Sequence, residues 1–105
     1  MSQTPASKPV SIGTDVLERA AEVIKCLGHP IRLRLLEGLE SGEKTVTELQ
    51  AYAGIGQAAV SYQLSALRAR DIVDCRREGT HVYYRIIEPK VSSILQCIRT
   101  CDLDA

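Results

Sequence analysis

The sequence predicts a mainly α-helical domain with one β-hairpin, and three observations lead to this class. Apolar residues recur at helical spacing in five segments. Before the fifth segment, two runs of strand formers flank a glycine-containing turn. The composition, 45% hydrophobic over 105 residues, suits one folded globule. We expect this domain over residues 13–102, with a loose tail at 1–12 and a short one at 103–105.

The first two helices are expected at 14–27 and from Pro30 to about Ser41. Thr14 suits an N-cap and Gly28 a helix end. Pro30 fits the first helical position, where its missing N–H costs nothing. The apolar stripe of the first helix is formed by Val16, Leu17, Ala20, Val23, Ile24 and Leu27. A chain this short buries a modest core, so an apolar helix face left over favours a dimer.

A short third helix and a longer fourth helix are expected on either side of Gly54. Thr47 and Gln50 stand in capping-box register at the start of the third helix. The fourth spans about 57–70 and has two unlike faces. One is apolar and expected to face the core, formed by Ala59, Val60, Leu64 and Leu67. The other is polar and lacks acids, formed by Gln57, Ser61, Tyr62, Gln63 and Arg68.

The polar face of the fourth helix is rich in side chains that hydrogen-bond base edges and phosphates. A helix of this kind, entered by a glycine-containing turn from a shorter helix, is typical of the second half of a DNA-binding helix-turn-helix. Strand-forming runs at 72–77 and 81–87 then predict a hairpin, and Pro89 begins a last helix. The expected order is α-α-α-α-β-β-α, a winged helix-turn-helix.

Charge and targeting signals are limited. The net charge is zero, although basic side chains outnumber acidic ones within 57–90. The first dozen residues lack an apolar stretch, and no apolar run approaches membrane-spanning length. We therefore expect a cytoplasmic protein with no membrane contact, whose four cysteines are thiols.

Four stretches, 27–33, 45–49, 57–67 and 76–84, occur in an order and at separations that resemble the ArsR/SmtB family of small bacterial winged-helix repressors. The resemblance runs from about residue 16 to residue 99. It implies a homodimer built through the first and last helices. It also implies binding to an imperfect palindrome in a double-stranded operator, and release when a ligand or chemical change reaches the dimer.

Specific residues are expected to contact DNA. In the major groove these are Gln57, Ser61, Tyr62 and Gln63, because Gln pairs with adenine and Ser or Tyr serves a base edge or phosphate. Arg68 shares their face, and Thr47 is placed at a helix N-terminus to touch a phosphate. The wing is expected to contact the backbone or minor groove through Arg76, Arg77, Thr80 and His81. His29 is expected to be an N-cap rather than a metal ligand.

The resemblance implies three possible sensor sites, and the residues that would form each of them are absent from this sequence. No Cys-x-Cys pair follows Glu48-Leu49, residues 89–105 contain no His, and Glu37 stands where a sulfur-sensing branch has a cysteine. Cys97 and Cys101 are instead four residues apart on the last helix, with Cβ atoms expected about 5–6 Å apart. A direct disulfide needs roughly 3.5–4.5 Å, so a soft bridging atom or added sulfurs would span the gap with less strain.

The predicted function is a DNA-binding repressor, not an enzyme, with no required cofactor. Its expected inducer is arsenite or a soft metal bound by Cys97 and Cys101, with Cys26 as a third thiol if the first and last helices pack together. A persulfide, polysulfide or redox sensor is the alternative, and Cys75 is expected to be partly buried and inert. A protein-interaction module fits less well because the outer face of the fourth helix is polar and lacks acids. A thiol oxidoreductase fits less well because the spacing is not C-x-x-C and no βαβ pattern occurs.

Overall fold

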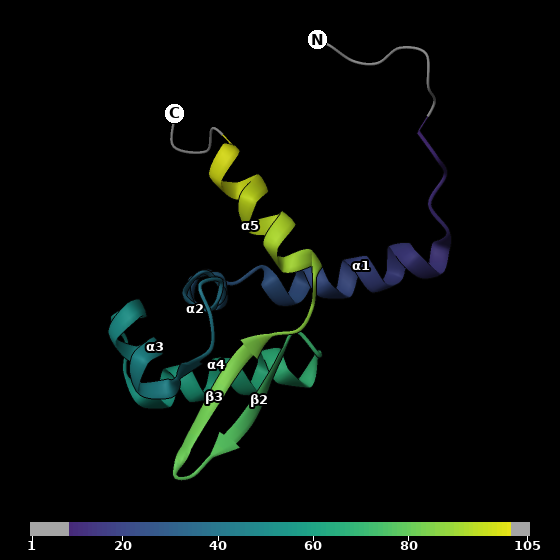
Figure 1. Cartoon of the computed structure of the whole chain (residues 1–105). Helices are drawn as coiled ribbons and strands as arrows, with labels where there is room; N and C mark the ends of the chain where they lie inside the picture. The colour runs from purple at the N-terminus through teal and green to yellow at the C-terminus, as the bar shows by residue number, and fades with distance from the viewer. Residues whose placement is uncertain (1–8, 102–105) are drawn as a thin grey trace.

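The computed structural model describes residues 9–101 and confirms the mainly helical class with a hairpin wing (Figure 1). Its elements are α1 (Thr14–Leu27), α2 (Pro30–Leu39), β1 (Lys44–Thr45), α3 (Val46–Ala53), α4 (Gln57–Ala69), β2 (Val73–Glu78), β3 (His81–Ile86) and α5 (Lys90–Thr100). Residues 1–8 and 102–105 lie outside the described residues, and with them most of the expected N-terminal tail, the expected end of the domain and the C-terminal tail.

The sheet has three antiparallel strands in the order β1-β3-β2 rather than two. In the hairpin Cys75 lies opposite Tyr84, and Lys44 of β1 pairs with the other edge of β3, also at Tyr84. The expected order of elements therefore lacked one strand. A strand of two residues is too short for an alternation pattern, and only its pairing with β3 defines it.

The cap of α3 differs from the expected one. The N-cap is Thr45, whose Oγ1 accepts from the backbone N–H of Glu48 at 3.2 Å, while Glu48 Oε1 accepts from the N–H of Thr45 at 2.8 Å. Thr47 lies inside the helix, so the expected box with Gln50 is wrong. Pairing of β1 with β3 ends at Thr45, which selects the register at which α3 starts. The cap of α1 is also different: it is Gly13 rather than Thr14.

The core is a single cluster to which every helix contributes. In α4 the buried residues include Val60, Leu64 and Leu67, as expected, whereas Ala59 is exposed and was wrongly placed in the core. The other core residues are Cys26, Leu27, Leu35, Leu36, Leu39, Leu49, Ile72, Val73, Val91 and Leu95. Burial of three side chains along one stripe of α4 holds this helix against α2, α3 and β2.

Two glycines permit the close arrangement of α2, α3 and α4. Gly54 ends α3 at φ 70°, a left-handed conformation that favours glycine and turns the chain into α4. Gly38 lies where α2 meets α3, and a Cβ there would approach Tyr52 Cδ2 to 2.9 Å. Together they define the geometry of the helix pair α3–α4.

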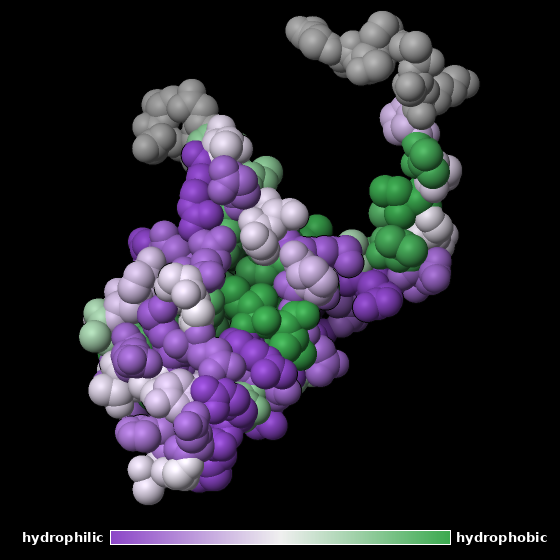
Figure 2. Space-filling view, viewed as in Figure 1, coloured by the Kyte–Doolittle hydropathy of each residue, from purple (hydrophilic) through white to green (hydrophobic). Residues whose placement is uncertain are grey.

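Apolar side chains remain exposed on α1 and at the end of α5. Val16, Leu17 and Ile24 are 53%, 50% and 64% exposed, and Ile98 on α5 is 38% exposed. In Figure 1, α1 and α5 lie on the side of the molecule away from the hairpin tip, and Figure 2 shows hydrophobic surface where the two helices meet and again near the N-terminal end of α1. None of the helices within residues 9–101 has the length and hydropathy to cross a membrane.

The α3 cap gives a direct test of the fold. Thr45→Ala removes the side-chain acceptor for the N–H of Glu48 and should lower the free energy of unfolding by about 1 kcal/mol. Thr47→Ala is the matched control, since Thr47 is exposed and its side chain caps nothing, and it should change stability by less than about 0.5 kcal/mol. Urea unfolding followed by circular dichroism measures both, and equal losses would contradict the assigned cap.

Candidate nucleic-acid interface

The exposed face of α4 carries three of the predicted DNA contacts. Tyr62 is 69% exposed, Gln57 is exposed at the first turn, and Ser61 is half-buried one turn later. Gln57 Nε2 donates to Ser61 Oγ at 3.2 Å, so these two side chains form one polar unit. Since α4 is anchored by its opposite face, this surface presents amide and hydroxyl groups in a fixed orientation to an incoming ligand.

Gln63 does not share that face, and the expectation that it is exposed is wrong. Its side chain is only 8% exposed, and its Oε1 accepts from Arg32 Nε at 2.7 Å. On a helix, residue 63 lies close to the stripe of Val60, Leu64 and Leu67. The sequence signal that was missed is Arg32, which lies within α2 and whose guanidinium needs a hydrogen-bond acceptor.

Arg68 lies near the end of α4 and is exposed as expected, but it has an acidic neighbour. Its Nε lies 3.5 Å from Asp74 Oδ1 on β2, and both side chains are well exposed. Such a pair contributes little to stability and is screened by salt. Arg68 is therefore available to a phosphate, in competition with Asp74.

Thr47 occupies the first turn of α3 and is exposed. Backbone N–H groups of the first turn of a helix have no partner within the helix, which favours an anion there. The Thr45–Glu48 box already satisfies one of these N–H groups and places a carboxylate at the same turn. The geometry thus leaves the Thr47 hydroxyl as the free polar group of this turn.

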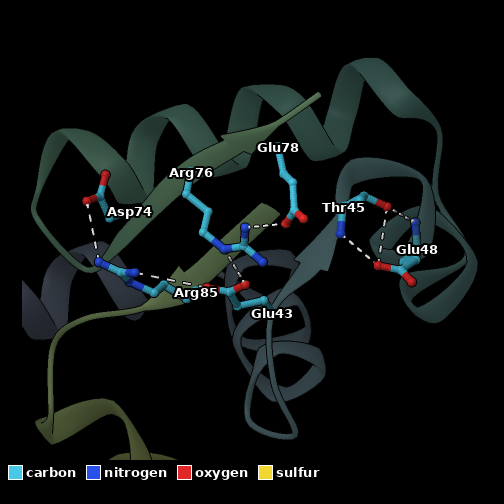
Figure 3. Close-up of polar contacts among 7 residues, drawn as sticks. All are labelled: Glu43, Thr45, Glu48, Asp74, Arg76, Glu78 and Arg85. Carbon is cyan, nitrogen blue, oxygen red and sulfur yellow. Dashed lines mark hydrogen bonds and ion pairs between the residues drawn. The ribbon is translucent and has the colours of Figure 1, made fainter. Parts of the chain in front are cut away.

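The wing contains a charge network that the sequence did not predict (Figure 3). Arg76 of β2 bridges two carboxylates, with Nε 2.8 Å from Glu43 Oε1 and Nη1 2.6 Å from Glu78 Oε1. Its guanidinium carbon also lies 4.8 Å from the centroid of the Tyr83 ring, within cation–π range. The hydrogen bond from Arg76 holds the pKa of Glu78 below its usual value. Arg76 is thus largely neutralised within the protein.

The other predicted wing residues are exposed at its tip. Arg77, Thr80 and His81 all lie around the β2–β3 turn, and the His81 ring is 6.1 Å from that of Tyr83. In the part of the chain that the structure describes, Arg77 has no carboxylate within ion-pair distance. By contrast Arg85 of β3 lies 4.0 Å from both Glu43 and Asp74. Arg77 is the wing cation that is free to meet a phosphate.

The cysteines lie apart from the α3–α4 face. Cys97 and Cys101 are exposed free thiols, Cys75 is half-buried as expected, and Cys26 is buried at the end of α1. Cys101 is the C-cap of α5 with an extended backbone, φ −83° and ψ 141°, so the helix ends just before the second thiol. Among residues 9–101 of one chain, no group of three or more cysteine, histidine or acidic side chains is arranged to hold a metal ion.

An ion pair ties the thiol-bearing end of α5 to α2. Arg99 lies between the two cysteines in sequence and pairs with Glu40, with a second contact from Arg99 Nη1 to Glu40 Oε2 at 3.3 Å. This hydrogen bonding holds the pKa of Glu40 below its usual value. His29 is the N-cap of α2, as expected, with Nδ1 accepting from the N–H of Ile31 at 3.2 Å.

Known proteins share this fold. Residues 29–74 match the family model described as bacterial regulatory protein, arsR family. A biofilm growth-associated repressor of Agrobacterium fabrum is 40% identical over 93% of this chain and 90% of its own length.

Two solved structures extend the comparison. The antimony-specific transcriptional repressor AntR has a TM-score of 0.81 at 34% identity, over 94% of this chain and 91% of that one. A homodimeric winged helix-turn-helix DNA-binding domain from Mycobacterium bovis, Mb0332, has a TM-score of 0.70 at 33% identity, over 81% and 79%.

These relatives are DNA-binding transcriptional regulators rather than enzymes, and regulators of this family bind DNA operators and are often homodimers. The winged helix-turn-helix, the polar outer face of α4 and the match over nearly the whole chain lead to one conclusion. The chain belongs to the ArsR family of bacterial transcriptional regulators.

Proposed function

We propose that this protein is a homodimeric repressor that reads a palindromic operator with α4 and leaves it when Cys97 and Cys101 react. The observation that carries the DNA-reading part is the division of α4 into a buried apolar stripe and an outer face with Gln57, Ser61 and Tyr62. Amide and hydroxyl groups on a rigid helix suit hydrogen bonding to base edges in a major groove. The proposed place of action is the cytoplasm.

The proposed dimer rests on the exposed apolar side chains of α1 and α5. Val16, Leu17 and Ile24 belong to one stripe of α1, and Ile98 continues the hydrophobic surface onto α5. Burying such a surface against a second copy is favourable by roughly 25 cal/mol per Å² of apolar area. A twofold axis there would present two α4 helices to half-sites about 34–36 Å apart.

The remaining proposed contacts are with the DNA backbone. Arg68 is exposed near the end of α4, and Thr47 on α3 and the wing residues Arg77, Thr80 and His81 are exposed beside it. Backbone contacts position a protein on the duplex, whereas base contacts specify sequence. Because Arg76 is held by two carboxylates, we assign to Arg77 the larger share of the electrostatic attraction between the wing and the DNA phosphates.

The proposed inducer is a trivalent metalloid such as arsenite. Two thiols react with As(OH)₃, each losing its proton to a departing hydroxide, so that two S–As bonds replace two As–O bonds and two waters form. Thiolates favour soft centres of this kind. The support is the pair of exposed thiols on α5 and the likeness to a structure described as an antimony-specific repressor.

Reactive sulfur is the second candidate inducer. Cys101 lies beyond the last turn of α5 in an extended conformation, so it can approach Cys97 without unwinding the helix interior. A polysulfide would act as oxidant: one cysteine thiolate attacks a sulfur of its chain and displaces a shorter polysulfide or sulfide anion, so that this cysteine carries one or more added sulfurs ending in S–H. The other thiolate then attacks the sulfur next to that terminal S–H and displaces hydrosulfide. The product is a bridge of two or more sulfurs between the cysteines.

Sequence reading by α4 can be measured directly. Tyr62→Ala and Gln57→Ala should each weaken operator binding about tenfold while weakening binding to scrambled DNA less than about twofold, because they remove base contacts. Fluorescence anisotropy with both duplexes at one salt concentration gives the ratio. Equal losses of affinity for the two duplexes would show that these residues contact phosphates rather than bases.

The two arginines of the wing provide a matched pair. Arg77→Ala should weaken binding and reduce the slope of log affinity against log salt by about one, since a free cation releases about one counterion. Arg76→Ala should change the slope by less than half as much, because Glu43 and Glu78 already neutralise it. The same slope change for both variants would show that the carboxylates do not compete with DNA.

The thiols are tested by a double substitution. Cys97→Ser with Cys101→Ser should bind the operator like the native protein but no longer release it on addition of arsenite or polysulfide. Cys75→Ser is the control and should release normally. Mass spectrometry of the treated native protein identifies the adduct, and normal release by the double variant would refute the sensing assignment.

A further inference from the structure

One guanidinium links the end of α1 to the middle of α4. Arg32 of α2 donates through Nε to Gln63 Oε1 at 2.7 Å, and through Nη1 to the carbonyl oxygen of Cys26 at 3.0 Å. The same Nη1 lies 3.6 Å from Cys26 Sγ. Cys26 is in the last turn of α1 and is 5% exposed, and Gln63 is 8% exposed. Arg32 therefore joins the last turn of α1 to the middle of α4, in addition to the exposed ion pair between Glu22 of α1 and Arg70, the C-cap of α4.

The orientation of the Gln63 amide is set by Arg32. Nδ1 of His29 accepts from the N–H of Ile31, so the proton of the neutral ring is on Nε2. Gln63 Nε2 lies 3.5 Å from that Nε2, which places two donors face to face and makes no hydrogen bond. Turning the amide over would place its NH₂ group against Arg32 Nε. It would also bring Oε1 to the N–H of His29 Nε2, but the short, charge-assisted hydrogen bond from Arg32 Nε to Oε1 favours the observed orientation.

The hydrogen bond between Arg32 and Gln63 fixes the position of α4 along its axis, whereas the surrounding apolar packing does not. Val60, Leu64 and Leu67 hold α4 on the core, but apolar contacts are non-directional and tolerate small shifts along a helix. A short, charge-assisted hydrogen bond has a defined distance and direction. Loss of either partner leaves a buried polar group without a partner, so both partners hold α4 in one register.

We infer that Arg32 and Gln63 are positioning residues for DNA recognition. They hold α4 in register with the last turn of α1, so that the reading face of Gln57, Ser61 and Tyr62 sits at the correct place relative to the dimer. Neither residue touches DNA in this arrangement. The inference rests on the proposed function, in which α4 reads DNA and α1 forms the dimer.

A double-mutant cycle tests this role with an operator selected in vitro from random DNA by the native protein. Arg32→Met and Gln63→Leu should each weaken operator binding about tenfold, and the double variant should lose no more than either single variant, because one contact is removed. Binding to scrambled DNA should change less than about twofold. Thermal melts of all three variants measure any loss of folded protein separately.

Gln57→Leu is the matched control, since it changes the same residue type on the exposed face of the same helix. Gln57 does not contact Arg32, so Gln57→Leu combined with Arg32→Met should lose more affinity than either single variant, unlike the pair of Arg32→Met and Gln63→Leu. Multiplying losses for Arg32→Met and Gln63→Leu would overturn the inference. So would relaxed preference at one base pair in Gln63→Leu alone, which would make Gln63 a base contact. If the native protein selects no site, the proposed function itself fails, and this inference with it.

Hydrogen exchange of the free protein tests the contact without DNA. In Arg32→Met, amides of the central turns of α4 should exchange about tenfold faster, while amides of α3 keep their native rates. If that variant does not fold, Arg32→Lys keeps the charge and the aliphatic stem but not the two-pronged contact, and it should show the same pattern more weakly. Unchanged α4 exchange in a folded variant would overturn the positioning role.

Discussion

The commitment of one face of α4 to the core is the constraint on which the rest of the structure depends. Val60, Leu64 and Leu67 are fully buried, so rotation of the helix about its axis would expose them to water. This fixes which side chains point outward, and these outward side chains form the proposed reading surface although they are only moderately polar. Gly54 supports the arrangement, because its left-handed backbone turns the chain from α3 into α4.

Electrostatics on the wing are balanced rather than strongly attractive. Glu43, Asp74 and Glu78 pair with Arg68, Arg76 and Arg85, which agrees with a net charge of zero for the whole chain. A protein with few free cations gains little from non-specific attraction to phosphates. In the proposed function, discrimination between sequences comes from hydrogen bonds at α4 and from the correct spacing of two subunits, both of which need precise placement of the helix.

The proposed reading face and the proposed sensing thiols lie at different ends of the molecule. The exposed thiols are on the last turn of α5 and just beyond it, near the apolar surface shared with α1, while the wing projects away from them (Figure 1). Two polar contacts in series would connect the proposed thiol site with the helix pair α3–α4. Arg99 contacts Glu40 on α2, and Arg32 on the same helix contacts Gln63 on α4. Helix α2 is thus the element common to both ends.

Much of this protein followed from the sequence by itself, because helical periodicity, Pro30, Gly28 and Gly54 are local signals. They predicted the five helices and the hairpin, and the polar face of α4 followed from the same periodicity. What only the tertiary structure decided depends on partners distant in sequence. Thr45 rather than Thr47 caps α3 because β1 pairs with β3, Arg76 is neutralised by Glu43, and Gln63 turns inward because Arg32 offers it a buried donor. A pattern along the chain shows which face a residue can occupy, but a long-range hydrogen bond chooses between neighbouring faces.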